Sequence, residues 1–167
     1  AGDAALLAGV RDALWSLAID NDVMLARFAA AIDLFSGSGR WWHRLLGDGV
    51  DRINLKKEGI FPTVHGVRSL ALAHRVAETS TTERLARLVE AQVLDPDLAR
   101  DLTDALQLLM ALKLKAGLDE MDRGDAVSGA VDPSALSPLE RDLLKDALGV
   151  VKRFKTLLRQ RFRLNAL

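Results

Sequence analysis

The sequence predicts an all-α protein, built as a bundle of about six helices. Three observations carry this prediction. Apolar side chains recur at helical spacing in several long segments, and residues typical of helix starts stand in front of them. β-Branched residues never alternate with polar ones over a useful length, and aromatic residues make up only 5% of the chain, so strand signals are weak. The length of 167 residues fits one domain.

The N-terminal half contains three predicted helices, the third of which follows a loop and an extended piece. Residues 4–18 and 23–35 each carry apolar side chains at helical spacing. Residues 36–49 form a glycine-punctuated loop, and residues 50–60 are predicted to be a short extended piece. A third helix begins at Pro62 and runs to about residue 76.

Three later helix starts carry capping signals. Two are capping boxes, in which a serine and a glutamate three residues later exchange hydrogen bonds with the backbone: Ser80 with Glu83, and Ser137 with Glu140. The third is Asp95 followed by a proline, which fits the first helical position because its missing N–H would have no partner there. We therefore expect helices to begin directly after Ser80, Asp95 and Ser137.

The last two helices differ in how much apolar surface they carry. Residues 98–118 are predicted to be the central helix of the bundle, because the helix is apolar over most of its circumference around residues 105–114. A linker at residues 123–138, rich in Gly, Asp, Ser and Pro, leads to a final helix with one apolar stripe and a polar opposite side. The stripe consists of Leu143, Leu144, Ala147, Leu148, Val151, Phe154, Leu157, Leu158 and Phe162.

Composition and charge exclude several classes of protein. The chain has no cysteine, so disulfides and thiolate metal sites are excluded, and its three histidines lack the His-x-x-x-His spacing of a zinc helix. Its 23 basic and 23 acidic residues cancel, so no overall field attracts nucleic acid or anionic lipid. No apolar run approaches the roughly 18 residues that cross a bilayer. We therefore expect a cytoplasmic protein without a membrane or nucleic-acid partner.

Acidic residues cluster twice along the chain. Asp119, Glu120 and Asp122 lie near a predicted helix end, and Asp101 and Asp104 are three positions apart. A two-metal phosphoryl-transfer site needs carboxylates that converge on one point, usually as Asp-x-Asp on a strand. The sequence has no such pair on a strand, so we interpret these acids as structural. No metal site is predicted, and no complete catalytic centre can be assembled from the residues.

One helical face could bind an anion. His65, Arg68, Leu72 and Arg75 recur at i, i+3, i+7 and i+10 and so share one side of the predicted third helix. A histidine and two arginines aligned in this way are suited to an anionic group. The local pattern by itself favours a solvated polar face.

The most informative stretch spans residues 51–72. Lys56 and Lys57 are adjacent, and Gly59 and Pro62 then mark a turn and a helix start. Cationic groups beside a helix N-terminus attract phosphate. A surface turn explains the same pattern when the stretch is considered alone.

This stretch resembles a characteristic segment of the putative nucleotidyltransferase substrate-binding domain family. The family pattern is approximately an acidic residue, a hydrophobic residue with two lysines, Gly-Ile, Pro, and a helix with Arg and Ala-Leu. The matching positions here are Asp51, Leu55-Lys56-Lys57, Gly59-Ile60, Pro62, Arg68 and Ala71-Leu72. The resemblance continues in the same order along the chain and covers about residues 20 to 163. The later matching segments are Thr82-Glu83-Arg84-Leu85, Asp132-Pro133, Leu136 to Arg141, Leu143-Leu144-Lys145 and Arg161-Phe162. It departs from the family at Lys113-Leu114-Lys115, where Arg-x-Arg and a Gln are common.

The resemblance implies a helical domain that follows a nucleotidyltransferase domain in bacterial and archaeal signal-transduction proteins, often behind cyclic-nucleotide-binding and CBS domains. Residues 1–167 are then one domain of a longer chain, and the start Ala-Gly-Asp, without Met or a signal peptide, agrees with this expectation. The catalytic Gly-Ser and Asp-x-Asp of the family belong to the upstream domain. We therefore expect no cofactor in this fragment and a Mg-nucleotide with the parent catalytic domain.

The resemblance also implies candidate binding residues. More distantly, the segment is similar to the Leu-Lys-x-Gly-Gly motif of uridylyl- and adenylyl-transferring enzymes, whose helical domain closes over the nucleotide. By this similarity, Lys56 and Lys57 are expected to neutralise triphosphate charge, with Arg68 in support. Further supporting positions are Asp51, His65 and Arg84.

Two functions follow from the sequence. The first is a non-catalytic substrate-binding domain that completes the nucleotide or acceptor cleft of a nucleotidyltransferase-type signal-transduction protein. The alternative is a protein-interaction or dimerisation module that transmits a ligand signal, favoured by the amphipathic final helix and the balanced charge. The alternative would make Lys56 and Lys57 replaceable without loss, and a homodimer would form through the final helix.

Overall fold

The computed structural model describes residues 3–18, 21–34 and 52–164, and within them the predicted all-α fold is confirmed. The described residues form six α-helices: α1 (Ala4–Ala18), α2 (Asp22–Ala30), α4 (Phe61–Ala73), α5 (Thr81–Glu90), α6 (Pro96–Asp122) and α7 (Pro138–Arg161). Shorter helical turns are η1 (Ala31–Asp33), η2 (Lys56–Ile60) and η3 (Pro133–Ala135). Two short strands, β1 (Ile53–Asn54) and β2 (Ala130–Val131), pair antiparallel.

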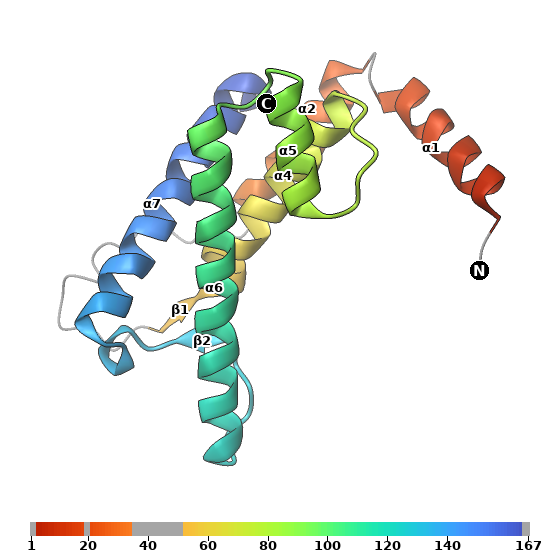
Figure 1. The fold of residues 1–167 in the computed structure, drawn as a ribbon. Coiled ribbons are helices and arrows are strands. Elements are labelled where there is room, and N and C mark those ends of the chain that lie inside the picture. The colour runs from red at the N-terminus through yellow and green to blue at the C-terminus, as the bar shows by residue number, and fades with distance from the viewer. Residues whose placement is uncertain (1–2, 19–20, 35–51, 165–167) are drawn as a thin grey trace.

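The two longest helices form the spine of the molecule. α6 and α7 pack along each other in opposite directions, as Figure 1 shows, and the strands β1 and β2 lie at one end of this pair. α4 and α5 pack at the other end, where α2 and η1 also contact α4. α1 projects away from this body and contacts α2 and α4.

The core has two clusters, one toward each end of the α6–α7 spine. One surrounds the β1–β2 pair and takes in Ile53, Val131 and Leu144. The other lies between α4, α5 and the far ends of the spine, and it includes Leu88 and Phe154. The half-buried Val150 packs against both clusters, so α6 and α7 connect them.

The apolar stripe predicted for the final helix is confirmed along its centre. Leu144, Leu148, Val151 and Leu158 of α7 are all buried. Leu143, which was expected to widen the stripe, leaves 43% of its surface exposed. The stripe therefore serves the core of this domain itself.

Two of the three predicted helix caps are confirmed. Ser137 Oγ accepts a hydrogen bond from the Glu140 backbone N–H at 3.2 Å, and Glu140 Oε2 accepts one from the Ser137 N–H at 2.8 Å. Asp95 caps α6 through two backbone N–H groups. The capping box predicted at Ser80 is wrong, because α5 begins there without any side-chain capping hydrogen bond. The exposed Ser80 contributes only its carbonyl, which accepts from the Arg84 N–H.

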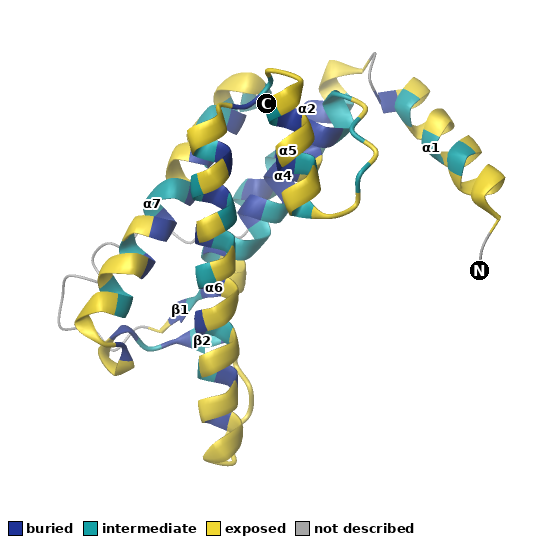
Figure 2. Ribbon diagram, in the orientation of Figure 1, coloured by how far each residue is buried: buried dark blue, intermediate teal, exposed yellow. Residues whose placement is uncertain are grey.

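Two further expectations are corrected by the structure. Residues 50–60 were predicted to be extended, but only Ile53–Asn54 are a strand, and the chain is helical from Leu55 onward. The 98–118 segment was predicted to be the central helix and apolar over most of its circumference; α6 does pack centrally against α7, but one side of its second half is exposed, as Figure 2 shows. Met110, Leu114, Leu118 and Met121 are each more than half exposed there. The predicted loop at residues 36–49 lies outside the described residues.

Candidate functional site

The lysine pair lies on a helical turn directly after β1. Leu55 is fully buried, whereas Lys56 and Lys57 are exposed. The Lys57 backbone N–H donates a hydrogen bond to Asn54 Oδ1 at 3.0 Å, which fixes the start of the turn. The hydrophobic-Lys-Lys pattern thus places one anchor in the core and two cations at the surface.

The turn itself is π-helical and packs tightly on the spine. η2 runs from Lys56 to Ile60 and continues into α4 without a break. Gly59 is buried in it, and a Cβ at this position would lie 2.6 Å from Leu109 Cδ1 of α6. Glycine therefore permits the close approach of η2 to α6, since any larger residue would force the buried Leu109 side chain to shift. A π-turn of this kind is often found at functional sites.

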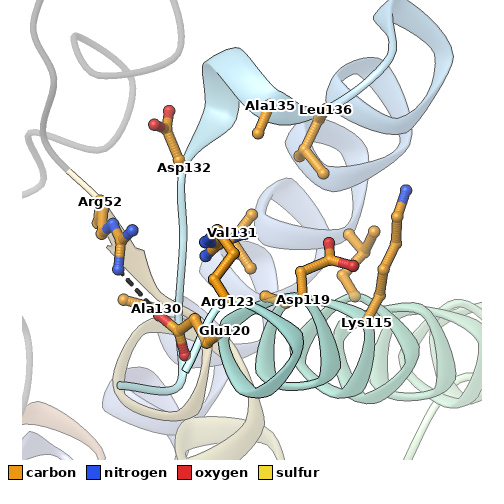
Figure 3. Close-up of a pocket in the computed structure, with 12 residues that line it drawn as sticks. Arg52, Lys115, Asp119, Glu120, Arg123, Ala130, Val131, Asp132, Ala135 and Leu136 are labelled. Carbon is orange, nitrogen blue, oxygen red and sulfur yellow. Dashed lines mark hydrogen bonds and ion pairs between the residues drawn. The ribbon is translucent and has the colours of Figure 1, made fainter. Parts of the chain in front are cut away.

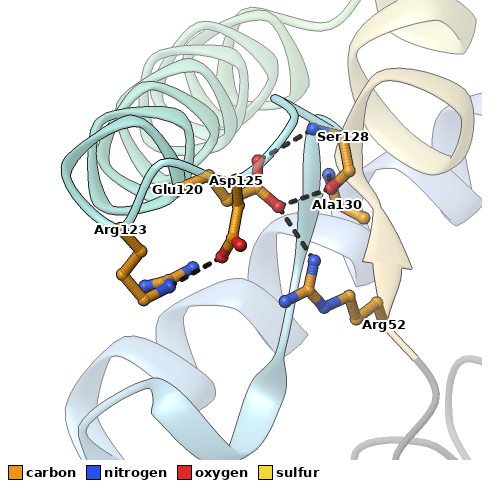
Figure 4. A network of polar contacts seen from close by, with 6 residues as sticks. All are labelled: Arg52, Glu120, Arg123, Asp125, Ser128 and Ala130. Carbon is orange, nitrogen blue, oxygen red and sulfur yellow. Dashed lines mark hydrogen bonds and ion pairs between the residues drawn. The ribbon is translucent and has the colours of Figure 1, made fainter.

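A buried carboxylate holds the strand that precedes this turn. Glu120 of α6 is only 2% exposed, and Figure 4 shows how donors from two other segments surround it. Its Oε1 accepts from Ser128 Oγ at 2.7 Å and from Arg52 Nη1 at 2.9 Å, and its Oε2 accepts from the Ser128 N–H at 2.8 Å. The hydrogen bonds from Ser128, together with the nearby Arg52 guanidinium, lower the pKa of Glu120. Glu120 therefore ties α6 to both segments that carry the strands.

These contacts agree with the structural interpretation of the acidic residues. Glu120 is a scaffold residue, and Asp101 accepts from Arg153 Nη2 of α7 at 2.8 Å. The Arg52–Glu120 pair was not predicted, because its members are 68 positions apart and no local spacing connects them.

A pocket of about 220 Å³, here called the ribbon pocket, lies beside this network (Figure 3). Its lining includes three cationic side chains, and each has a carboxylate partner. Arg52 pairs with Glu120 at 2.9 Å, as described. The other pairs are Lys115 with Glu140 at 2.6 Å and Arg123 with Asp125 at 3.0 Å. The ribbon pocket therefore offers a ligand little uncompensated charge.

A second pocket, here called the arginine pocket, lies between α4 and the helices α1, α2 and α5. It has a volume of about 290 Å³ and is formed by residues from α1, α2, α4, α5 and the segment between α4 and α5. Arg11, Arg68 and Arg84 line it, and the rest of its lining is apolar, with the rings of Trp15 and Phe28 among it. None of its lining residues is acidic.

Arg68 and Arg84, which the sequence analysis named as candidate binding residues, therefore both line the arginine pocket. Arg84 Nε donates to the Glu78 carbonyl at 2.7 Å. Burial lowers the pKa of Arg84, and the like charge of Arg68 lowers it further. Arg11 was not foreseen, because it belongs to a different helix and shares no motif with the other two.

His65 has a different position from the one its helical spacing suggested. It is buried, with 8% of its surface exposed, and its Nε2 lies 2.7 Å from the Phe28 carbonyl oxygen of α2. Its ring stacks on Phe61 and contacts Phe28. His65 thus joins α2 to α4, and the predicted solvated face is wrong for this residue.

The structure does not bring the lysine pair and Arg68 together. Lys56 and Arg68 lie on one continuous helical segment, and at 1.5 Å per residue their Cα atoms are roughly 18 Å apart. Asp51, the remaining candidate, lies outside the described residues. The binding roles of all these residues stay predictions.

The described part of the chain has neither a candidate metal centre nor a membrane-spanning helix. It contains no group of three or more His, Asp or Glu side chains arranged to hold a metal ion. None of its helices is both long enough and apolar enough to cross a membrane.

Fold and site together define a helical domain whose candidate ligand-binding groups are cations in two separate places, the exposed η2 turn and the arginine pocket. The sequence model of the putative nucleotidyltransferase substrate binding domain matches residues 22–162. The chain belongs to this family. Comparison with curated proteins and with solved structures found no match.

Proposed function

We propose that this domain docks on a nucleotidyltransferase catalytic domain and completes its nucleotide or acceptor cleft. The observation that carries the proposal is the exposed pair Lys56 and Lys57, held on a rigid turn in a member of a substrate-binding domain family. The catalytic groups and the Mg-nucleotide belong to the partner domain in this scheme. We place that partner upstream in the same chain of a signal-transduction protein.

The chemistry of the turn supports this role. Lysine ammonium groups are compact point charges, and a nucleoside triphosphate needs such charges to offset its own. The buried Leu55 and the packed Gly59 hold the backbone of the turn, so ligand binding would have to order only the two exposed lysine side chains and not the turn that carries them. The Glu120 network fixes β1 just before them.

The test is nucleotide binding by a chain that also carries its upstream nucleotidyltransferase domain. Calorimetry with ATP, UTP, GTP and CTP in the presence of Mg²⁺ would be done on the parent protein and on Lys56→Ala plus Lys57→Ala. Loss of two phosphate contacts is expected to weaken binding by about tenfold or more. The matched control, Lys113→Ala plus Lys152→Ala, removes two lysine charges elsewhere and should change affinity less than about twofold. Equal affinity of the double mutant and the parent would exclude the proposed role.

The alternative function is an interaction or dimerisation module, and the surface that favours it is α1 and not the final helix α7. The α7 stripe is buried within the domain, so it does not favour a dimer. α1 instead exposes apolar side chains, with Leu6, Val10 and Leu17 each more than two-thirds exposed. Sedimentation velocity on the wild type and on Leu6→Ser plus Val10→Ser separates the two functions. A dimer that this variant dissociates would support the alternative.

A further inference from the structure

We infer that the arginine pocket binds a small organic anion, with its acidic group on Arg68 and Arg84 and its apolar body against Trp15 and Phe28. This site is separate from the lysine turn, and the inference does not depend on the proposed function. It concerns a ligand of the domain itself.

The charge balance of the pocket is the first support. Among the described residues, Arg68 has no hydrogen-bond or ion-pair partner, and the buried Nε of Arg11 has no hydrogen-bond partner. The Glu78 carboxylate offsets part of the Arg84 charge, but it accepts its hydrogen bond from Arg87 Nε at 2.6 Å, outside the pocket lining. Arg68 and Arg84 still repel each other, and a bound anion would relieve both this repulsion and the unmet donor of Arg11.

The contrast with the ribbon pocket sharpens this point. There every lining cation is matched by a carboxylate of the same chain, whereas the arginine pocket has three cations and no acid in its lining. The planar guanidinium fork is also the side chain best suited to hold a carboxylate or phosphate through two parallel hydrogen bonds.

The apolar lining of the arginine pocket indicates the chemistry of the ligand beyond its acidic group. Trp15 and Phe28 supply aromatic surface, and Leu14 and Leu72 supply aliphatic surface. The Arg11 guanidinium lies 5.2 Å from the Trp15 ring centroid, so the charged and apolar parts adjoin. A volume of about 290 Å³ is at the lower end of the usual range for ligand sites, which suits a ligand of one ring and one acidic group.

The experiment is calorimetry on the full chain with two probes, phenyl phosphate and phenylacetate. They share the aromatic body and differ in the acid, so the tighter probe identifies a phosphate or a carboxylate ligand. Phenol and inorganic phosphate each represent half of the ligand. We expect one aromatic anion to bind at least about tenfold more tightly than either half, since both contacts are required.

Variants then locate the site. Arg68→Gln is expected to weaken binding about tenfold, and because Arg68 is exposed and unpaired among the described residues, the fold should be unchanged by circular dichroism. Arg27→Gln is the matched control, since Arg27 is an exposed arginine of the neighbouring α2 that does not line the pocket. Lys56→Ala plus Lys57→Ala should also leave this binding intact.

Three results would overturn the inference. They are no binding of either aromatic anion at millimolar concentration, inorganic phosphate bound as tightly as phenyl phosphate and phenylacetate, or Arg68→Gln binding as tightly as wild type. Binding that Arg27→Gln reduces as strongly as Arg68→Gln would assign the effect to overall charge, and would likewise exclude the site.

Discussion

Glu120 is a carboxylate that the protein buries and surrounds with three hydrogen bonds from Ser128 and Arg52. A buried charge is stable only when its partners compensate for the loss of water. The exposed Lys56 differs in this respect, because its ammonium group remains in water. The first residue maintains the scaffold, and the second is available to a ligand.

Replacing Glu120 by glutamine should therefore destabilise the protein. Glutamine keeps the shape but turns one acceptor oxygen into a donor group that faces Arg52 or Ser128. We expect the melting temperature of Glu120→Gln to fall by several degrees. Glu90→Gln, at an exposed ion pair on α5, should shift it by less than about one degree. Similar shifts for the two variants would show that the network does not hold the strands.

Glu140 predicts a pH dependence of stability. Hydrogen bonds from Lys115 Nζ, and then from the Ser137 N–H, lower its pKa from 4.5 to about 2. Because the folded-state pKa lies below the unfolded one, this contribution is present above pH 4.5 and is lost as the pH falls toward 2.

Thermal melts between pH 2 and pH 6 would measure this effect. Glu140→Gln should lose less stability than wild type across the window from pH 4.5 to 2, since it has no carboxylate to protonate. Glu83→Gln is the control, because α5 begins without a side-chain capping bond and Glu83 has no capping role there. If Glu140→Gln lost as much thermal stability as wild type between pH 4.5 and pH 2, Glu140 would not be the source of this pH dependence.

At the scale of elements, glycine decides how closely α4 approaches α7. A Cβ at Gly66 would collide with Leu158 Cδ1 and would lie 2.7 Å from Phe154 Cε1. Gly149 of α7, by contrast, has open space around it. The same substitution should therefore have opposite effects at the two positions.

Gly66→Ala is expected to destabilise the protein by about 1–3 kcal/mol, because the two buried side chains must shift to make room. Gly149→Ala should stabilise it by about 0.5–1 kcal/mol through the better helix propensity of alanine. Urea denaturation with constant m-values would measure both. Stabilisation by Gly66→Ala would mean that α4 and α7 are not packed as closely as described.

The elements that the sequence predicted are those specified by local signals. The caps at Asp95 and Ser137 and the apolar stripe of α7 depend on residues within a few positions of one another. The β1–β2 pair and the π-turn were not predicted, since both depend on contacts with α6 that are remote in the chain.

The candidate site divides in the same way. The exposure of Lys56 and Lys57 followed from a contiguous motif. The arginine pocket combines three arginines from three helices, and only the fold places Arg11 beside Arg68 and Arg84. The burial of His65 was also not predictable, because its partner carbonyl belongs to Phe28 of another helix.

At the scale of the whole molecule, balanced charge predicts its solubility. The 23 basic and 23 acidic residues give a pI of about 7.1. Repulsion between molecules is weakest where the net charge is zero, so solubility should be lowest near pH 7 and rise on both sides. Precipitation by polyethylene glycol at pH 5.5 to 8.5 would measure this, and a steady trend without a minimum would contradict it.

The π-turn at Lys56–Ile60 has a consequence for sequence change in this region. A π-turn holds one more residue than an α-helical turn, so it is equivalent to a one-residue insertion. Deleting the half-buried Glu58 would restore an α-helix and rotate the preceding segment by about 100° relative to α4. That rotation would take Ile53 out of register with Val131 and turn both lysines toward another side. Length at this point is therefore as strongly constrained as residue identity.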